Sequence, residues 1–141
     1  GGRCRTGRDT MSDTLHAPQH GHCLCGNVTY TVSETPKNAS VCHCGQCRRQ
    51  SGHLWASAQV ADNAITIKGD TLAWYRASAH AERGFCSACG SFLFWRLDGE
   101  DAVSFSLGSL NPPTGLCLEK HIFVADKGDY YAIADDLPQE D

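Results

Sequence analysis

Seven of the nine cysteines in this 141-residue chain fall into three tight clusters. The central cluster, residues 42–47, reads Cys-His-Cys-Gly-Gln-Cys and is followed at once by Arg48 and Arg49. A Cys-x-Cys pair precedes it and a Cys-x-x-Cys pair follows it, formed by Cys23 and Cys25 and by Cys86 and Cys89. Thiols at this spacing are typical of metal ligands, because a tight turn directs two sulfurs toward one ion. The clusters therefore predict a fold built around bound metal.

The composition favours metal binding over a disulfide framework. With 141 residues, 41% hydrophobic and 20% charged, the chain is expected to form one globular domain that folds without covalent cross-links. A net charge of −4 argues against broad nucleic-acid binding. The sequence shows neither a membrane-spanning apolar run nor a secretory signal pattern, so we expect a cytoplasmic protein. In a reducing compartment, patterned cysteines bind metal or take part in catalysis more often than they form disulfides.

We expect three segments along the chain. Residues 1–20 are expected to be vector-derived sequence before Met11 and a disordered lead-in after it, so that Cys4 has no part in the chemistry. Residues 21–138 are expected to form a single zinc-binding β domain. Residues 139–141 are expected to be a frayed acidic tail.

Alternating apolar and polar residues predict a mostly-β fold of short antiparallel strands and hairpins, with little helix. The clearest alternation runs through Val28, Tyr30 and Val32. Only residues 45–50 are expected to make a helical turn, which Gly52 ends. Further strands are predicted at residues 40–41, 54–60, 65–67, 72–76, 92–97, 103–107 and 121–124.

Two groupings of the clustered cysteines are consistent with tetrahedral zinc. In the first, the two Cys-x-x-Cys units close a zinc ribbon, which leaves the other clustered thiols unused. In the second, a closed four-sulfur site is accompanied by a three-sulfur site with one open position. Closed sites are structural, whereas three protein ligands with an exchangeable fourth position are typical of catalytic zinc. The second grouping predicts two zinc ions per chain, one held by Cys23, Cys25, Cys86 and Cys89 and one by Cys42, Cys44 and Cys47.

Three motifs occur in a fixed order. Residues 23–26 read Cys-x-Cys-Gly, residues 42–49 read Cys-His-Cys-x-x-Cys-Arg-Arg, and residues 83–91 read Arg-x-Phe-Cys-x-x-Cys-Gly-Ser. Together with residues 121–131, they resemble the glutathione-dependent formaldehyde-activating enzyme and centromere protein V family. The resemblance implies a β-tent zinc-binding fold with the four-plus-three partition of the cysteines. It also implies carbon–sulfur bond chemistry on glutathione and formaldehyde at the three-sulfur site.

The first functional hypothesis is therefore a zinc-dependent carbon–sulfur lyase or synthase that acts on a small thiol–aldehyde adduct. The resemblance implies S-hydroxymethylglutathione as an example of that adduct. Three thiolates make zinc a weak activator of water but suit it to holding a fourth thiol as thiolate, the nucleophilic form. The predicted catalytic residues are Cys42, Cys44 and Cys47. The predicted substrate-binding residues are Arg48, Arg49 and His43, because a guanidinium fits a carboxylate and an imidazole can carry a proton.

Two other hypotheses use the same residues. Both metals can serve only to stabilise a non-catalytic binding module, or the three-sulfur site can sense metal or redox state by losing metal and oxidising. Cys117 discriminates between enzyme and module. We expect it to be a buried or inert thiol, and the enzyme hypothesis weakens if it closes the three-sulfur site.

Arg83 is a candidate for binding charge on the substrate or on a zinc–thiolate cluster. His121 is expected to be a sheet histidine, and the tryptophans are expected in the core.

Overall fold

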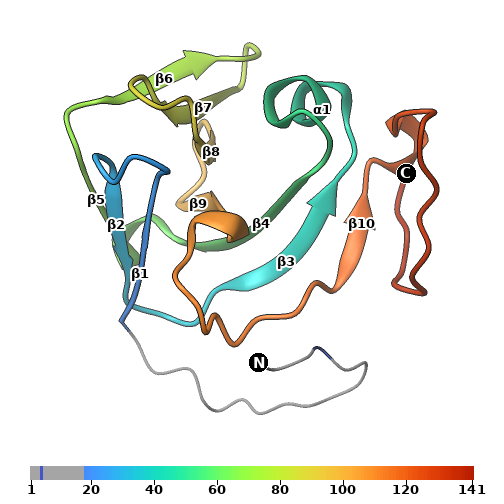
Figure 1. Cartoon of the computed structure of the whole chain (residues 1–141), viewed down its shortest axis with the longest axis horizontal. Coiled ribbons are helices and arrows are strands. Elements are labelled where there is room, and N and C mark those ends of the chain that lie inside the picture. The colour runs from blue at the N-terminus through green and yellow to red at the C-terminus, as the bar shows by residue number, and fades with distance from the viewer. Residues whose placement is uncertain (1–3, 5–17) are drawn as a thin grey trace.

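The computed structural model describes residue 4 and residues 18–141 (Figure 1). The expected vector-derived and disordered residues fall mainly on 1–3 and 5–17, which lie outside the described residues. The described part is mostly β, which confirms the predicted fold class. In chain order its elements are β1 (Gln19–His22), β2 (Thr29–Val32), β3 (Lys37–Cys42), α1 (Gly45–Ser51), β4 (Trp55–Ala61), η2 (Asp62–Ala64), β5 (Ile65–Lys68), β6 (Leu72–Arg76), β7 (Ala81–Cys86), β8 (Phe92–Leu97), β9 (Ala102–Ser106), η3 (Leu107–Ser109), β10 (Lys120–Ile122) and η4 (Val124–Asp126).

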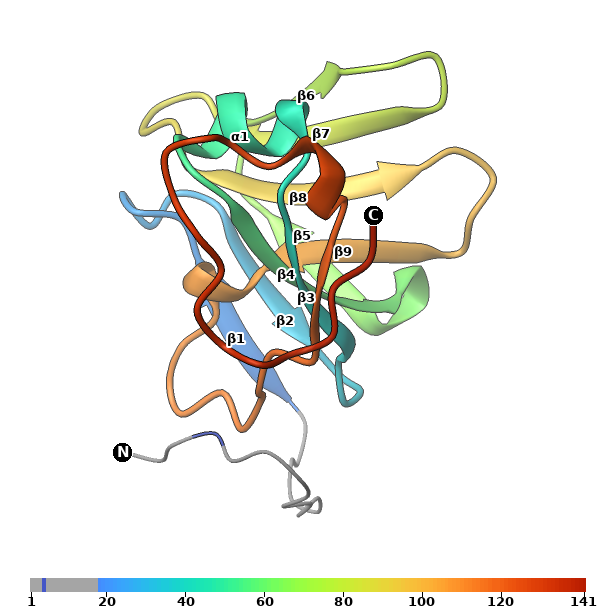
Figure 2. The ribbon, with the colours of Figure 1, turned by 90° about the vertical axis from the view of Figure 1, so that its right-hand side faces the viewer.

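The strands form two sheets. The smaller sheet has the order β1-β2-β5 and is antiparallel throughout. The larger sheet has the order β10-β3-β4-β9-β8-β7-β6, and within it only β10 and β3 run parallel. In Figures 1 and 2 the smaller sheet lies against one side of the larger sheet, and the C-terminal segment lies beside α1 at the opposite side.

The alternating residues of β2 and the turn before it join the two sheets. Val28, Tyr30 and Val32 are each at most 2% exposed. The Tyr30 ring lies 5.4 Å from the Phe94 ring of β8 and 5.5 Å from the Phe105 ring of β9, centroid to centroid. Its hydroxyl is hydrogen bonded to Ser109 Oγ at 2.7 Å, so the polar end of this buried side chain has a partner. The core thus lies between the sheets and leaves the other face of the larger sheet available for a site.

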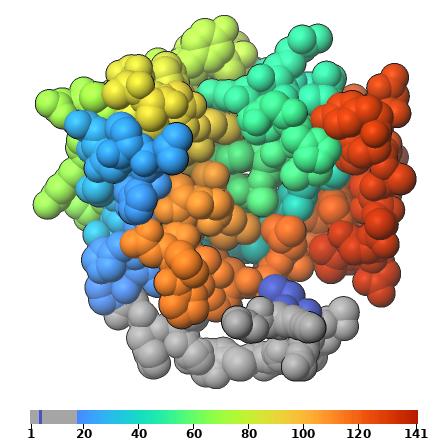
Figure 3. All heavy atoms as spheres, in the orientation of Figure 1, coloured from blue at the N-terminus to red at the C-terminus, as the bar shows by residue number. Residues whose placement is uncertain are grey.

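The C-terminal segment pairs with β10. The His121 amide donates to the Pro138 carbonyl at 2.9 Å, and the Glu140 amide donates to the His121 carbonyl at 2.8 Å. The tail that was expected to fray is therefore hydrogen bonded as far as Glu140. The last strand ends at Ile122 rather than at the predicted residue 124, because Phe123 adopts a left-handed conformation with φ 56° and a 3-10 turn follows. Figure 3 shows this segment packed against the side of the molecule next to α1.

Candidate functional site

The four-cysteine cluster joins the turn after β1 to the turn after β7. Its members are Cys23, Cys25, Cys86 and Cys89, whose sulfurs lie within 4.8 Å of one another. Both turns close through glycine: Gly26 has φ +83° and Gly90 has φ +84°, a conformation that other residues rarely adopt. Backbone amides point at the sulfurs, since the Val28 amide donates to Cys23 Sγ at 3.3 Å and the Cys89 amide donates to Cys86 Sγ at 3.4 Å. The cluster therefore ties the smaller sheet to the larger one.

The sulfur spacing of this cluster suits zinc. A tetrahedral ion with Zn–S distances of about 2.3 Å requires sulfurs about 3.8 Å apart. Cys25 Sγ lies 3.7 Å from Cys23 Sγ and 3.8 Å from Cys86 Sγ. Hydrogen bonds from the Ser91 side chain and backbone lower the pKa of the Cys89 thiol to about 5, which favours the thiolate that a metal requires. Of the two groupings left open by the spacing, the structure contains the four-plus-three partition.

The three-cysteine cluster lies where β3 meets α1. Cys42 ends β3, Cys44 caps α1 by accepting from the Cys47 amide at 3.4 Å, and Cys47 lies in the first turn of the helix. Gly52, with φ 91°, ends this seven-residue helix. The three sulfurs lie within 4.8 Å of one another, and within the described residues no fourth histidine, cysteine or carboxylate joins them. This donor set fits a metal ion with three protein ligands and one position for another molecule.

The pKa values of these thiols are shifted in opposite directions. Hydrogen bonding from Cys42 and from the Arg83 guanidinium lowers the pKa of the Cys47 thiol to about 6, against the opposing effect of burial. The same contact with Cys47, together with burial, raises the pKa of the Cys42 thiol. The contact between Cys42 and Cys47 thus shifts their pKa values in opposite directions, and the Arg83 guanidinium favours the thiolate form of Cys47.

A cavity of about 850 Å³ opens over the three-cysteine cluster, and all three cysteines line it. Its floor is the face of the larger sheet that points away from the core. In β4, for example, Ala58 and Val60 lie in the core, whereas Ser57 and Gln59 line the cavity. Trp55 and Trp95 also line it. The prediction of core tryptophans is confirmed for Trp55, which is buried in a second core cluster with Cys42 and Cys47, while Trp95 packs against that cluster and Trp74 against the main one.

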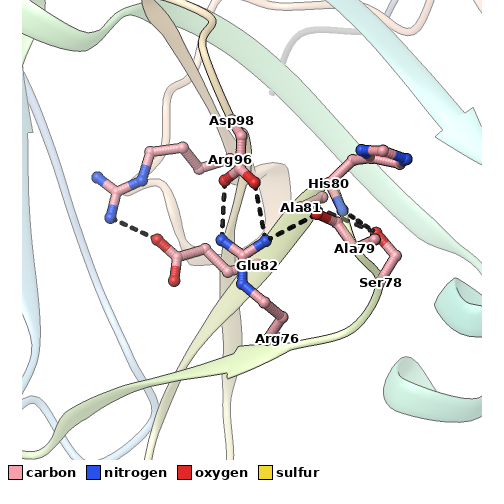
Figure 4. Close-up of polar contacts among 8 residues, drawn as sticks. All are labelled: Arg76, Ser78, Ala79, His80, Ala81, Glu82, Arg96 and Asp98. Carbon is pink, nitrogen blue, oxygen red and sulfur yellow. Dashed lines mark hydrogen bonds and ion pairs between the residues drawn. The ribbon is translucent and has the colours of Figure 1, made fainter.

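One wall of the cavity is formed by Ser78 and His80 from the connection between β6 and β7 and by Ala81, the first residue of β7 (Figure 4). Ser78 Oγ accepts hydrogen bonds from the backbone amides of His80 and Ala81, both at 3.1 Å. At the base of the connection, Arg76 makes two hydrogen bonds of 2.8 Å to the Asp98 carboxylate. Local hydrogen bonds thus hold this wall in place.

The arginine at the cluster is Arg83 of β7, rather than the two arginines that follow the cysteines in sequence. Arg83 lines the cavity and its Nη1 donates to Cys47 Sγ at 3.6 Å. Arg49 is exposed and Arg48 is half-buried in α1, and neither is among the residues that line the cavity. The predicted substrate-binding residues Arg48 and Arg49 therefore lie outside the cavity lining, although they follow the cysteines directly in sequence.

His43 is not at the cavity either. It is 1% exposed, and both ring nitrogens contact other side chains: Nδ1 lies 2.6 Å from Tyr131 Oη and Nε2 lies 2.8 Å from His121 Nδ1. His43 therefore contacts other protein side chains in the structure, whereas a contact with substrate was predicted for it. Burial, followed by the nearby His121, lowers the pKa of the His43 imidazole, which favours its neutral form.

The contacts of His43 belong to a hydrogen-bonded chain of four side chains behind the cysteine loop. His121 Nε2 lies 3.0 Å from both carboxylate oxygens of Asp135. Because a carboxylate only accepts, His121 donates to Asp135, His43 donates to His121 Nδ1, and the Tyr131 hydroxyl donates to His43 Nδ1. With both imidazoles neutral, every polar group in the chain has a partner. The C-terminal segment therefore fixes the loop between Cys42 and Cys44, and His121 is the buried sheet histidine that was predicted.

Replacing His121 by leucine is expected to destabilise the protein by about 1–3 kcal/mol, because it leaves the buried Nε2–H of His43 without an acceptor. Thermal unfolding followed by circular dichroism measures the loss. The matched control is His20→Ala, which removes an exposed histidine of the smaller sheet whose Nδ1 contacts Thr31 Oγ1 at 3.1 Å. Equal melting temperatures for the two variants would contradict the proposed support of the loop.

Cys117 is not the lone thiol that was expected. It is exposed and forms a disulfide with Cys4 across a sequence separation of 113 residues. The prediction of a buried or inert Cys117 thiol is therefore wrong, whereas Cys4 belongs to neither of the two cysteine clusters. The three-cysteine cluster is unaffected, because a disulfide-bonded Cys117 cannot supply a thiolate to close it.

Comparison with known proteins identifies the family. A family model described as glutathione-dependent formaldehyde-activating enzyme matches residues 18–126. The chain belongs to this family, which confirms the resemblance seen in the cysteine motifs. An uncharacterized lyase of Schizosaccharomyces pombe is 27% identical over 121 residues, which cover 81% of this chain and 84% of that protein.

Other relatives are matched over shorter stretches. A Podospora anserina protein named as a glutathione-dependent formaldehyde-activating enzyme is 30% identical over 55% of this chain, and one from Aspergillus terreus is 27% identical over 64%. The chain spans 39% and 50% of the lengths of these two proteins. A crystal structure of a Rhodobacter sphaeroides protein aligns with a TM-score of 0.49 at 23% identity, over 66% of this chain and 91% of that one. Within the described residues, no helix combines the length and apolar character needed to cross a membrane.

Proposed function

We propose that the chain is a zinc-dependent carbon–sulfur lyase or synthase that acts on a small thiol–aldehyde adduct at the three-cysteine cluster. The observation that carries the proposal is the position of this cluster. Its three sulfurs line a cavity of about 850 Å³ and have no fourth protein ligand among the described residues. The four-cysteine cluster, by contrast, contributes nothing to the cavity lining. One cluster is therefore built as a structural site and the other as a site that meets a ligand.

Glutathione and formaldehyde are the substrates we propose. Family membership and the printed names of the fungal relatives support this pair. The cavity volume lies within the range of about 300–1,000 Å³ that is usual for small-molecule sites. Its lining combines two tryptophans with polar side chains from five strands, which suits a polar, peptide-like thiol.

When bound by Cys42, Cys44 and Cys47, zinc supplies a positive centre that keeps a substrate thiol in its thiolate form. In the addition reaction, the thiolate sulfur forms a bond to the aldehyde carbon, and the carbonyl electron pair moves to oxygen. The oxygen takes up one proton, which balances the proton lost by the thiol, and no group leaves. The reverse reaction breaks the same carbon–sulfur bond and releases the aldehyde. Trp55 and Trp95 contribute apolar walls that limit water around the reacting groups.

The test is the rate of adduct formation between glutathione and ¹³C-formaldehyde, measured by exchange NMR with and without protein. The wild type is expected to accelerate exchange above the rate in buffer. Cys42→Ser is expected to lower the catalysed rate by more than about a hundredfold, since even the groups around metal ligands are worth 10- to 100-fold.

Cys117→Ser is the matched control, because it removes a cysteine outside the cavity. It is expected to keep the wild-type rate. If the wild type fails to accelerate the reaction of any small thiol with any small aldehyde, the enzyme proposal is wrong and the non-catalytic binding module becomes the better description.

A further inference from the structure

We propose that Arg83 forms a binding site for an anionic oxygen of the substrate beside the three-cysteine cluster. The proposal deepens the proposed function and rests on it for the identity of the substrate. Two groups can supply such an oxygen: the alkoxide that forms from the aldehyde during addition, and a carboxylate of the thiol.

Arg83 is a buried cation without a carboxylate partner. Its side chain belongs to a residue that is 5% exposed, and no ion pair with Asp or Glu is found for it among the described residues. Its protein contacts are Cys47 Sγ at 3.6 Å and Gln50 Oε1 at 3.4 Å, both made by Nη1, and the Phe92 ring, whose centroid lies 5.4 Å from Cζ. Apart from the Cys47 sulfur, no anionic group contacts this guanidinium among the described residues, and a buried cation is stabilised when a further anion completes its surroundings.

The unused donors of Arg83 lie on one edge of the guanidinium. Nε is fully buried and has no hydrogen-bond partner. Nη2 has no acceptor in the part of the chain that the structure describes, and it is not among the fully buried unpaired atoms. Nε and Nη2 form the side of the guanidinium opposite the contacts of Nη1, and this side presents two parallel N–H groups. Because Arg83 lines the cavity, Nη2 is the donor that a ligand oxygen can reach.

Trp55 adds a second unpaired donor to the same group of side chains. Its indole Nε1 is fully buried without a partner, and the side chain is 7% exposed. The Trp55 ring stacks on the Phe92 ring with a centroid distance of 4.3 Å, and Phe92 also carries the Arg83 guanidinium over its face. Native proteins leave few buried donors unpaired. The described residues contain three such side chains, Arg48, Trp55 and Arg83, and the last two line the cavity, which points to a ligand acceptor there.

The position of Arg83 fits the place where charge develops. The substrate sulfur is expected beside the cysteine sulfurs, and Arg83 already contacts one of these at Cys47. The oxygen that becomes negative is only two bonds from the substrate sulfur. A donor fixed at that place stabilises the charged state more than the neutral aldehyde, which is how such groups accelerate a reaction. A carboxylate oxygen would accept from the same Nη2 donor.

The first experiment measures anion binding without turnover. Formate is titrated into the zinc-loaded protein, and tryptophan fluorescence reports binding, because Trp55 and Trp95 line the cavity. Arg83→Gln is expected to weaken formate binding by roughly tenfold to a hundredfold, the value of a hydrogen bond to a charged group. Arg83→Lys, which keeps the charge, is expected to lose less. Zinc content is measured in each variant. If Arg83→Gln loses metal, the formate affinity of the wild type is compared with that of Arg83→Lys instead.

Arg76→Gln is the matched control, because it removes one positive charge from the neighbouring strand at an exposed ion pair (Figure 4). It is expected to bind formate as the wild type does. Formate binding that is absent from the wild type, or equal in wild type and Arg83→Gln, would overturn the proposal.

The second experiment identifies the source of the anionic oxygen. Rates are compared for glutathione and for cysteamine, a thiol without a carboxylate. If Arg83 binds the alkoxide, Arg83→Gln lowers kcat by a similar factor for both thiols and leaves their KM unchanged. If it binds a carboxylate, the variant raises KM for glutathione alone. Formate binding that depends on Arg83 in a wild type without thiol–aldehyde turnover would support the anion site and reject the proposed function.

Discussion

Cys86→Ser is expected to abolish cooperative folding at physiological temperature. Cys86 is 0% exposed and belongs to the cluster that links the smaller sheet to the turn between β7 and β8. Structural zinc contributes an apparent free energy of about 10–16 kcal/mol, which is as large as the whole stability of a typical domain, about 5–15 kcal/mol. Loss of one buried sulfur from this closed site is therefore expected to remove a large part of the free energy that metal binding adds to the contact between the sheets. Thermal unfolding by circular dichroism and zinc analysis measure the result.

Ala88→Ser is the matched control for this prediction. It introduces the same side chain at an exposed position of the same turn and leaves all four sulfurs in place. The control is expected to unfold like the wild type and to keep its zinc. A Cys86→Ser protein with a wild-type unfolding transition would show that the fold does not depend on metal at this cluster.

Cys44→Ser is expected to have the opposite pattern, loss of metal without loss of fold. Zinc is expected to fall from two ions per chain to one, because one of the two clusters loses a ligand. The helix should survive, since Cys44 is the N-cap of α1 and serine is a preferred N-cap that can accept the same hydrogen bond from the Cys47 amide. The measurements are elemental zinc per chain and the unfolding transition of the same sample.

The outcome separates the proposed roles of the two clusters. Cys117→Ser serves as the control, and it is expected to keep both zinc ions because Cys117 belongs to neither cluster. Two zinc ions in Cys44→Ser would mean that another group replaces the lost sulfur. One zinc ion in the wild type that cannot be raised by added zinc would mean that the three-cysteine cluster does not hold metal.

The residues that could be predicted from sequence are those whose role is local. The alternation at Val28, Tyr30 and Val32 marks β2 because one side of that strand is buried and the other is not. The glycines after the cysteine pairs mark tight turns, and both have positive φ. The strand β7 gives no such signal: Arg83, Gly84 and Cys86 are all buried, so the two sides of the strand do not differ in polarity.

The residues that sequence reasoning misplaced depend on contacts between distant segments. Arg48 and Arg49 were chosen because they follow the cysteines directly, but a helix turns successive side chains to different sides. Arg83 reaches Cys47 across 36 residues, and no sequence period reports that contact. The cavity is lined by residues such as Ser57 and Gln59. Their polar side chains alternate with apolar ones along the strand, as they also do in a strand whose outer face is exposed to solvent, so the sequence does not distinguish the two cases.

The hydrogen-bonded chain behind the cysteine loop has a consequence for how the protein is made. The loop of Cys42 and Cys44 emerges from the ribosome early, whereas its partners Tyr131 and Asp135 are synthesised close to the end of this chain and beyond residue 126, where the family match stops. Until these residues arrive, His43 has no partner in the C-terminal segment. The three-cysteine loop is thus expected to reach its final form only after translation has passed residue 135, while the four-cysteine cluster can assemble as soon as Cys89 is available.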